Sequence, residues 1–441
     1  MISHAECQHH YSLNEHLKLH KVLNQAEFCI SLRLKNIQVM LNIDNFISEI
    51  VIKRSKSLFS DDINANYDTL LARIKDKKIC VIGGAGSIGS SFIKAILPFQ
   101  PAELIVVDLS ENNLAELTRD LRSTAGLFVP SEYHTYAIDF SSPIFRKILA
   151  SNGGCDVVAN FSAHKHVRSE EDRYSVEALI ENNILKAQKL LDLLTEFNTE
   201  RFFCVSTDKA ANPVNIMGAS KRIMEDLIMA YSDRFNVSTA RFANVAFSNG
   251  SLPDGWIHRM LKRQPLSAPS DVKRYFVSPQ ESGQICLLAC LLGDNREIFF
   301  PKLDESSMMT FSSICDEFLN ALGYKKVEFQ TDDEAKAFMA SQPGNSLQYA
   351  VHYSVSDTSG EKPFEEFYSE GENIDFSRFD SLGVIKQKPK PSLDDVNSFL
   401  GEIRHLFAKK ELSKREIVSA IKEYLPSFNH DERGKNLNYK M

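Results

Sequence analysis

The sequence predicts an α/β fold, in which a doubly wound parallel sheet is joined to a smaller mixed region and to a helical extension at each end. Three observations indicate this fold. Strand and helix patterns alternate from Lys77 onward, a glycine-rich turn joins the first strand to the first helix, and the regular alternation ends after about Asn249. Repeated strand–helix–strand units with right-handed crossovers place their strands parallel in one sheet. The 441 residues are enough for two or three domains.

The elements of the sheet follow one another along the chain with short connections. Apolar runs bounded by turn residues predict strands at 78–82, 103–108, 132–138, 156–161, 201–206 and 238–242. Apolar residues that recur with helical spacing predict helices at 87–97, 112–124, 175–197 and 220–235. This order indicates that the carboxyl ends of the strands share one edge of the sheet, where ligands bind in folds of this class.

The glycine-rich turn predicts a dinucleotide site. Gly83, Gly86 and Gly89 follow a buried strand and open a helix, so that Ser87 and Ile88 lie in its first turn. Glycines at these places permit a tight turn and close approach of a pyrophosphate, whose charge the helix N-terminus stabilises. Together with the strand–turn–helix context, this spacing predicts a Rossmann-type unit.

Two aspartates at strand ends concern the choice of cofactor. Asp108 ends the second strand and is followed by Leu109, which offers no cation to a 2′-phosphate. A carboxylate there accepts from a ribose 2′-hydroxyl and repels a 2′-phosphate, so we expect NAD rather than NADP. Asp139 follows the third strand and suits the adenine edge, with a simple loop cap as the alternative.

A cluster of polar residues follows the strand at 201–206. It places a hydroxyl, an acid and an amine side by side, in Thr207, Asp208 and Lys209, and a second amine comes at Lys221. An acid and an amine next to each other suit paired proton transfer, in which one group gives a proton while the other takes one.

Several segments resemble the extended short-chain dehydrogenases, and within them the nucleotide-sugar 4,6-dehydratases of polysaccharide biosynthesis. The resemblance covers about residues 75–300 and rests on the glycine spacing, the Thr-Asp-Lys triplet and four segments: 160–167, Asn183, 241–245 and 273–276. It implies cofactor contacts at Phe161, Ser162, Ala163 and Lys221, and substrate contacts at Lys165, His166, Asn183, Asn244 and Arg274. The sequence departs from the family pattern at Asn160, Ala243 and Met217, and Met217 stands where the family has its catalytic tyrosine.

The resemblance implies an internal redox cycle on a sugar such as UDP-N-acetylglucosamine or a close NDP-hexose. Tightly bound NAD takes a hydride from C4, Lys209 removes the C5 proton, Asp208 protonates the leaving C6 hydroxyl, and the hydride returns to C6. Lys221 would hold the nicotinamide ribose and Thr207 the 4-oxygen. Lys209 then needs a pKa drawn toward neutrality, and Asp208 a raised pKa. Because a thioether is a poor proton acceptor, Lys209, Asp208 or a water relayed through Lys221 remain candidates for deprotonating the 4-hydroxyl.

Two alternatives stay open: a sugar 4-epimerase or 4-keto reductase on the same fold, and a non-catalytic sugar-nucleotide-binding scaffold, which Met217 would suit. The net charge of −7 gives no general attraction to nucleic acid, and no apolar run approaches the ~20 residues of a membrane span, so we expect a cytoplasmic protein. We also expect a homo-oligomer. We predict no metal site, because no acid or cysteine set completes the pair His16 and His20.

The chain is expected to divide into a helical extension at 1–75, an NAD-binding unit at 76–248, a substrate-binding region at 249–330 and a C-terminal extension at 331–441. Cys286 and Cys290 are expected in the core. We expect the acidic and aromatic tract 357–377 to be ordered, with its glutamates 361, 365 and 366 on a solvated face. Capping boxes are predicted at Ser12 and Ser413.

Overall fold

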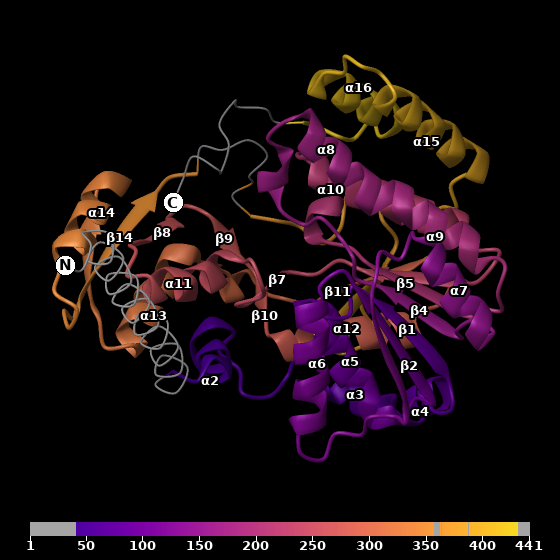
Figure 1. Cartoon of the computed structure of the whole chain (residues 1–441), viewed down its shortest axis with the longest axis horizontal. Helices are drawn as coiled ribbons and strands as arrows, with labels where there is room; N and C mark the ends of the chain where they lie inside the picture. Colours follow the sequence, from indigo (N-terminus) through magenta and orange to yellow (C-terminus); the bar gives the residue numbers. More distant parts are fainter. Residues whose placement is uncertain (1–40, 357–361, 363, 387, 431–441) are drawn as a thin grey trace, which may run out of the picture.

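The computed structural model describes residues 41–356, 362, 364–386 and 388–430 (Figure 1). The predicted capping box at Ser12, the pair His16 and His20, and Glu361 lie outside the described residues. Among the described residues, no helix combines the length and the apolar character that crossing a membrane requires.

A nine-stranded sheet forms the larger part of the molecule, in the order β15-β16-β11-β6-β5-β4-β1-β2-β3. Seven of its strands are parallel: β1 (Lys78–Ile82), β2 (Glu103–Asp108), β3 (Glu132–Ala137), β4 (Val157–Asn160), β5 (Arg201–Val205), β6 (Asn236–Ala240) and β11 (Glu297–Pro301). Two short strands extend this edge: β16 (Leu382–Ile385) pairs antiparallel with β11, and β15 (Ile374–Asp375) pairs antiparallel with β16. The order reverses between β1 and β4, which opens a crevice at their carboxyl ends. The predicted doubly wound sheet is confirmed.

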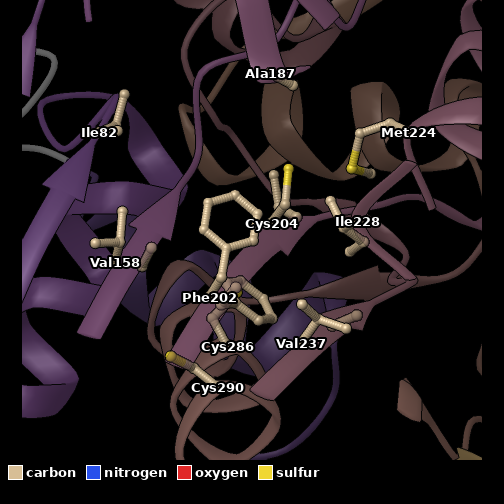
Figure 2. Close-up of a cluster of buried hydrophobic side chains, with 14 of the residues drawn as sticks. Ile82, Val158, Ala187, Phe202, Cys204, Met224, Ile228, Val237, Cys286 and Cys290 are labelled. Carbon is tan, nitrogen blue, oxygen red and sulfur yellow. The ribbon is translucent and has the colours of Figure 1, made fainter. Parts of the chain in front are cut away.

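Helices cover both faces of this sheet (Figure 1). One face carries α5 (Ser87–Ile96) and α12 (Pro279–Leu292), and the other carries α8 (Arg173–Ile180), α9 (Lys186–Leu194) and α10 (Ile216–Ala230). Outside α10 pack α15 (Leu393–Phe407) and α16 (Lys414–Tyr424). The core between the sheet and its helices contains Phe202, Cys204, Cys286 and Cys290 (Figure 2), so the expected core position of the last two cysteines is confirmed.

The helices differ from prediction in three places. A helix that the sequence patterns did not suggest, α7 (Pro143–Asn152), follows β3, with Pro143 in its first turn and Gly153 in the left-handed region just after its end. The long helix expected at 175–197 is interrupted by a π-helical turn, Glu181–Leu185. Helix α10 begins at Ile216, four residues before the expected start, because the side chain of Asn215 caps it by accepting from the Gly218 N–H.

A second, smaller unit surrounds a three-stranded parallel sheet of β8 (Leu266–Pro269), β13 (Lys325–Phe329) and β14 (Gln348–Ser354). It has its own apolar cluster, in which Trp256 and Phe318 are buried. The helices of this unit are α11 (Leu252–Leu261), α13 (Phe311–Ala321) and α14 (Asp332–Ser341). The N-terminal segment joins the cluster through Phe46, whose ring lies 5.8 Å from that of Phe318.

The remaining α-helices of the described residues are α2 (Ile43–Phe46) with its π-helical continuation Ile47–Val51, α3 (Ser60–Ala65), α4 (Tyr67–Ile74) and α6 (Glu111–Ser123). Helix α4 packs against α12, and α6 packs against β2 and β3. The division of the chain at 75, 248 and 330 stays a prediction. The large sheet takes β11, β15 and β16 from beyond position 248.

After β14 the chain returns from the small sheet to the large one. The described part of this return segment that the site uses, residues 362 and 364–373, is anchored by Phe367, which is buried against the ring of Phe300. The Ser369 hydroxyl donates to the carbonyl of Ala211, just after the predicted catalytic triplet. The tract is therefore ordered over these residues, as predicted, and the capping box at Ser413 is confirmed.

Candidate active site

The glycine-rich turn lies between β1 and α5, at the crevice where the strand order reverses. Gly83 has a φ of +70°, and a Cβ there would lie 2.7 Å from the backbone nitrogen of Ser162, two residues after the end of β4. A Cβ on Gly89 would meet the Gly83 carbonyl at 2.3 Å. These two glycines therefore let the turn pack tightly against β4 and the helix.

Gly86 differs, and this difference supports a ligand in the turn. A Cβ on Gly86 would meet only the Gly83 carbonyl, at 3.4 Å, so packing within the protein does not demand a glycine there. The residue is the N-cap of α5, at the positive end of the helix dipole. A side chain would occupy the space in which a pyrophosphate approaches the helix N-terminus, so the residues fit a dinucleotide. Ser87 accepts from the Asn249 N–H, and Ile88 lines the cavity described below.

The two strand-end aspartates have different surroundings. Asp108 accepts from the Ala85 and Ser110 N–H groups, which fixes its carboxylate beside the glycine turn. Asp139 accepts from the backbone and hydroxyl of Ser141 and pairs with Lys186. Asp139 thus has the contacts of a loop cap with a lysine partner, and its expected contact with adenine stays a prediction.

The loop after β4 is held by Asn183, which lies in the π-helical turn. The Asn183 side chain accepts from the His164 N–H at 2.8 Å and donates to the His164 carbonyl at 2.9 Å and to the Ser220 hydroxyl. These contacts fix the path of the loop that carries Phe161, Ser162 and Ala163. The side chain thus braces the loop, and its expected contact with the substrate stays a prediction.

The predicted catalytic triplet lies at the carboxyl end of β5. Asp208 Oδ1 accepts from the Thr207 hydroxyl at 2.8 Å and from the Lys209 N–H at 2.8 Å, and it lies 3.1 Å from Lys209 Nζ. Asp208 is buried. The structure therefore brings the hydroxyl, acid and amine together at the edge of the sheet where the sequence placed them.

A fourth group joins this cluster from the return segment. The carboxylate of Glu365 lies 3.5 Å from Lys209 Nζ and 3.8 Å from the guanidinium of Arg274. Its side chain is only 3% exposed. The prediction of a solvated face at the glutamates is wrong for Glu365, while the neighbouring Glu366 is exposed. An acidic tract resembles a solvated face in sequence, and no local pattern identified this burial.

The charges around Lys209 determine its protonation. Burial alone would lower the pKa of Lys209, but the carboxylates of Asp208 and Glu365 raise it above its ordinary value. The expectation of a pKa drawn toward neutrality is therefore wrong for this arrangement. The pKa of Glu365 is raised, because its burial outweighs the attraction of Lys209.

Lys221 and Met217 lie on α10, facing the end of β5. Lys221 is buried and its ammonium group donates to the Val205 carbonyl at 3.0 Å, while burial lowers its pKa. Met217 is 3% exposed, and its backbone N–H donates to the buried carboxylate of Glu170 at 2.8 Å. The structure therefore places a thioether, not a hydroxyl, beside the lysine of this helix.

A cavity of about 290 Å³ connects these groups. Its lining includes Thr207, Lys209, Met217, Lys221 and Asn244, together with Ile88, Phe161 and Ala163. Asp208 lies behind this wall, in contact with Thr207 and Lys209.

A larger cavity of about 980 Å³ lies next to the first, toward the small sheet. Lys165 and His166 line both cavities, and the Lys165 ammonium group donates to the Asn249 carbonyl at 2.9 Å. Arg274 is buried, is not among the lining residues of either cavity, and donates to the carbonyls of Lys273 and Lys362. The two cavities together extend from the glycine turn to the small unit.

The fold and this site are those expected of a short-chain dehydrogenase/reductase. The chain belongs to the family described as "Polysaccharide biosynthesis protein", whose profile matches residues 79–386. The resemblance that the motifs indicated is therefore confirmed at the level of the family.

Three relatives show the range of names in this family. The chain is 31% identical to "Uncharacterized membrane protein MJ1061" of Methanocaldococcus jannaschii, over 79% of this chain and 96% of the relative. It is 30% identical to "Probable polysaccharide biosynthesis protein EpsC" of Bacillus subtilis, over 67% of this chain but only 48% of that longer relative. It is 26% identical to "UDP-N-acetylglucosamine 4,6-dehydratase (inverting)" of Campylobacter jejuni, over 81% of this chain and 98% of the relative.

A further relative and one solved structure complete the comparison. "UDP-glucose 4-epimerase" of Rickettsia prowazekii is 27% identical, over 65% of this chain and 88% of the relative. The X-ray structure of Pen from Bacillus thuringiensis superposes with a TM-score of 0.56 at 19% identity, covering 73% of this chain and 88% of that one. This superposition supports the description of the fold.

Proposed function

We propose that this protein is a nucleotide-sugar 4,6-dehydratase that converts UDP-N-acetylglucosamine, or a close NDP-hexose, to its 4-keto-6-deoxy form for the synthesis of a surface polysaccharide or glycan. The observation that carries this proposal is the pair Asp208 and Lys209, in contact at 3.1 Å at the end of β5. An acid and an amine side by side suit removal of water, which needs one proton taken from C5 and one given to the C6 hydroxyl.

The cofactor of this reaction would be NAD. Gly86 and the N-terminus of α5 would hold its pyrophosphate, Asp108 its adenine ribose, and Lys221 its nicotinamide ribose. When bound, this cofactor would supply the acceptor for the C4 hydride and the donor that returns it to C6. Asp108 favours NAD because a carboxylate repels the 2′-phosphate of NADP.

The residues of the chain would handle the protons. Lys209 lines the cavity and would take the C5 proton once its amine is neutral. Asp208 lies just behind the cavity wall. It would therefore give its proton to the leaving hydroxyl after a small movement of its side chain past Thr207. Met217 cannot accept the proton of the 4-hydroxyl. The candidate acceptors are therefore Lys209, Asp208 and a water held by Lys221.

The experiment that tests the proposal is incubation of the purified protein with UDP-N-acetylglucosamine in heavy water. We expect loss of one water and gain of one deuterium at C5, seen by mass spectrometry and NMR. Inversion at C4 without loss of water would instead indicate the 4-epimerase, the name that one relative carries. Binding without conversion, also with GDP- and dTDP-sugars, would indicate a scaffold.

Two further properties belong to the same proposal. NAD should stay with the protein through purification, because the cycle regenerates it, and heat denaturation should release it for chromatography. A homo-oligomer and a cytoplasmic location remain predictions, which light scattering and cell fractionation would test.

A further inference from the structure

We infer that Glu365 is a positioning residue for the proposed reaction: its carboxylate holds the Lys209 ammonium group and the Arg274 guanidinium side by side, and so sets the pH range in which Lys209 accepts the C5 proton. This inference rests on the proposed function. Its geometry is the pair of contacts at 3.5 Å and 3.8 Å from one carboxylate oxygen, in a side chain that is 3% exposed.

Contacts of the return segment fix Glu365 beside Lys209 and Arg274. Arg241, which is fully buried at the end of β6, donates to the Phe367 carbonyl at 3.1 Å and to the Glu372 carboxylate at 3.0 Å. The other side of its guanidinium pairs with buried Glu225, which also accepts from the Ser206 hydroxyl at 2.7 Å. The strand end before Thr207 and the backbone two residues after Glu365 are thus fixed to one buried arginine.

The charges that face Glu365 come from three parts of the chain. They are Lys209 and Asp208 after β5, Arg274 on β9 (Lys273–Arg274) and Lys362 in the return segment. Two carboxylates and three cations therefore share this space. Because Asp208 and Glu365 both face Lys209, removing the charge of Glu365 makes the neutral amine easier to form.

This inference extends to the substrate through Arg274. Its guanidinium is held by Glu365 and by the Lys362 carbonyl, both in the return segment, and through Glu365 it is connected to Lys209, which lines the cavity. A fork of N–H donors suits a diphosphate. One carboxylate therefore orients both the group that would take the proton and the group that would bind the phosphates.

The direct test measures the titration of Lys209 in protein labelled at the lysine ε-carbon. The Lys209 NMR signal is assigned by its loss in Lys209→Arg. We expect its midpoint to fall in Glu365→Gln by an amount of the order of one pH unit, as for loss of one neighbouring charge. The matched control is Glu370→Gln, which changes an exposed carboxylate of the same segment and should leave the midpoint unchanged. An unchanged midpoint in Glu365→Gln would overturn the inference.

A second measurement follows C5 deuterium exchange against pH. A rate that needs neutral Lys209 rises with pH, so this rise should move to lower pH in Glu365→Gln. It should move less in Glu365→Asp, which keeps the charge.

If Glu365→Gln does not fold, the NMR titration of Glu365→Asp decides the question. The shorter aspartate places its carboxylate farther from the Lys209 ammonium group, and this still lowers the Lys209 midpoint. If no nucleotide sugar loses water in the wild type, the proposed function fails, and the NMR titration still tests Glu365 by itself.

Discussion

Met217 is the residue at which this site departs most from its family pattern. Its side chain lines the cavity beside Lys221, and the Glu170 carboxylate fixes its backbone. A phenol at this position would give the 4-hydroxyl a proton acceptor next to a buried ammonium group, which stabilises a phenolate.

We therefore expect Met217→Tyr to accelerate the first hydride transfer by about ten-fold or more. Stopped-flow absorbance of the reduced nicotinamide measures this step in a single turnover. Met217→Leu, which keeps the apolar volume, should leave the rate near that of the wild type. Equal rates in Met217→Tyr and the wild type would mean that another group already removes this proton efficiently.

Asp208 allows a second test at the scale of the residue. Asp208→Asn keeps the shape and still accepts from Thr207, but its amide cannot give a proton to the C6 hydroxyl. We expect dehydration to fall by about 100-fold or more, while calorimetry shows unchanged binding of the nucleotide sugar. The control Asp226→Asn alters a carboxylate on the outer side of α10 that pairs with Arg222. Retained dehydration in Asp208→Asn would assign the acid to another group.

Sequence patterns predicted the parts of the site that are local. The glycine turn and the Thr207–Lys209 triplet are each continuous in sequence, and the strand before each fixes its place. Glu365 was missed because its contact with Lys209 depends on the path of the return segment. The pKa of Lys209 was predicted in the wrong direction for the same reason, since one of its two carboxylates was unknown.

At the scale of the element, α10 is the helix that carries Met217 and Lys221. The buried Glu170 carboxylate accepts from the Ile216 and Met217 N–H groups, which are among the free donors of its first turn. This contact was not visible in sequence. Helix α7 is a different case, because Pro143 and Gly153 are typical helix boundary residues and indicate this helix locally.

Replacing the carboxylate at the start of α10 should destabilise the protein. We expect Glu170→Ala to cost about 1–3 kcal/mol, because two buried N–H groups lose their acceptor. Differential scanning calorimetry should show a lower melting temperature. The control is Glu402→Ala, at an exposed position on α15. A melting temperature equal to that of this control would contradict the role of Glu170 as a cap.

At the scale of the whole molecule, the buried cluster around Arg241 joins the large sheet to the return segment. Burial alone would raise the pKa of Glu372, but Arg241 and Lys388 lower it to about 2. A carboxylate with a lowered pKa in the folded state stabilises that state above its unfolded pKa of about 4.5, and this stabilisation is lost as the pH falls toward about 2.

We therefore expect Glu372→Gln to melt at a lower temperature than the wild type at pH ~6, with the gap narrowing as the pH falls below about 4.5. Calorimetry across this range measures the gap directly. Glu370→Gln, an exposed neighbour, should melt like the wild type at every pH. A gap for Glu372→Gln that stays constant with pH would show that the charge of Glu372 does not stabilise the fold.

The path of the return segment also fixes when the site is completed during synthesis on the ribosome. The glycine turn and Lys209 emerge early, whereas Glu365 and Glu372 follow only after the small sheet has been translated. Until then Arg241 has Glu225 as its partner, and Lys209 has Asp208 alone. A nascent chain can thus form the nucleotide crevice before it has its full set of charges. A ribosome that stops near the end of β14 would release a chain that retains the crevice residues and lacks the carboxylate beside Lys209.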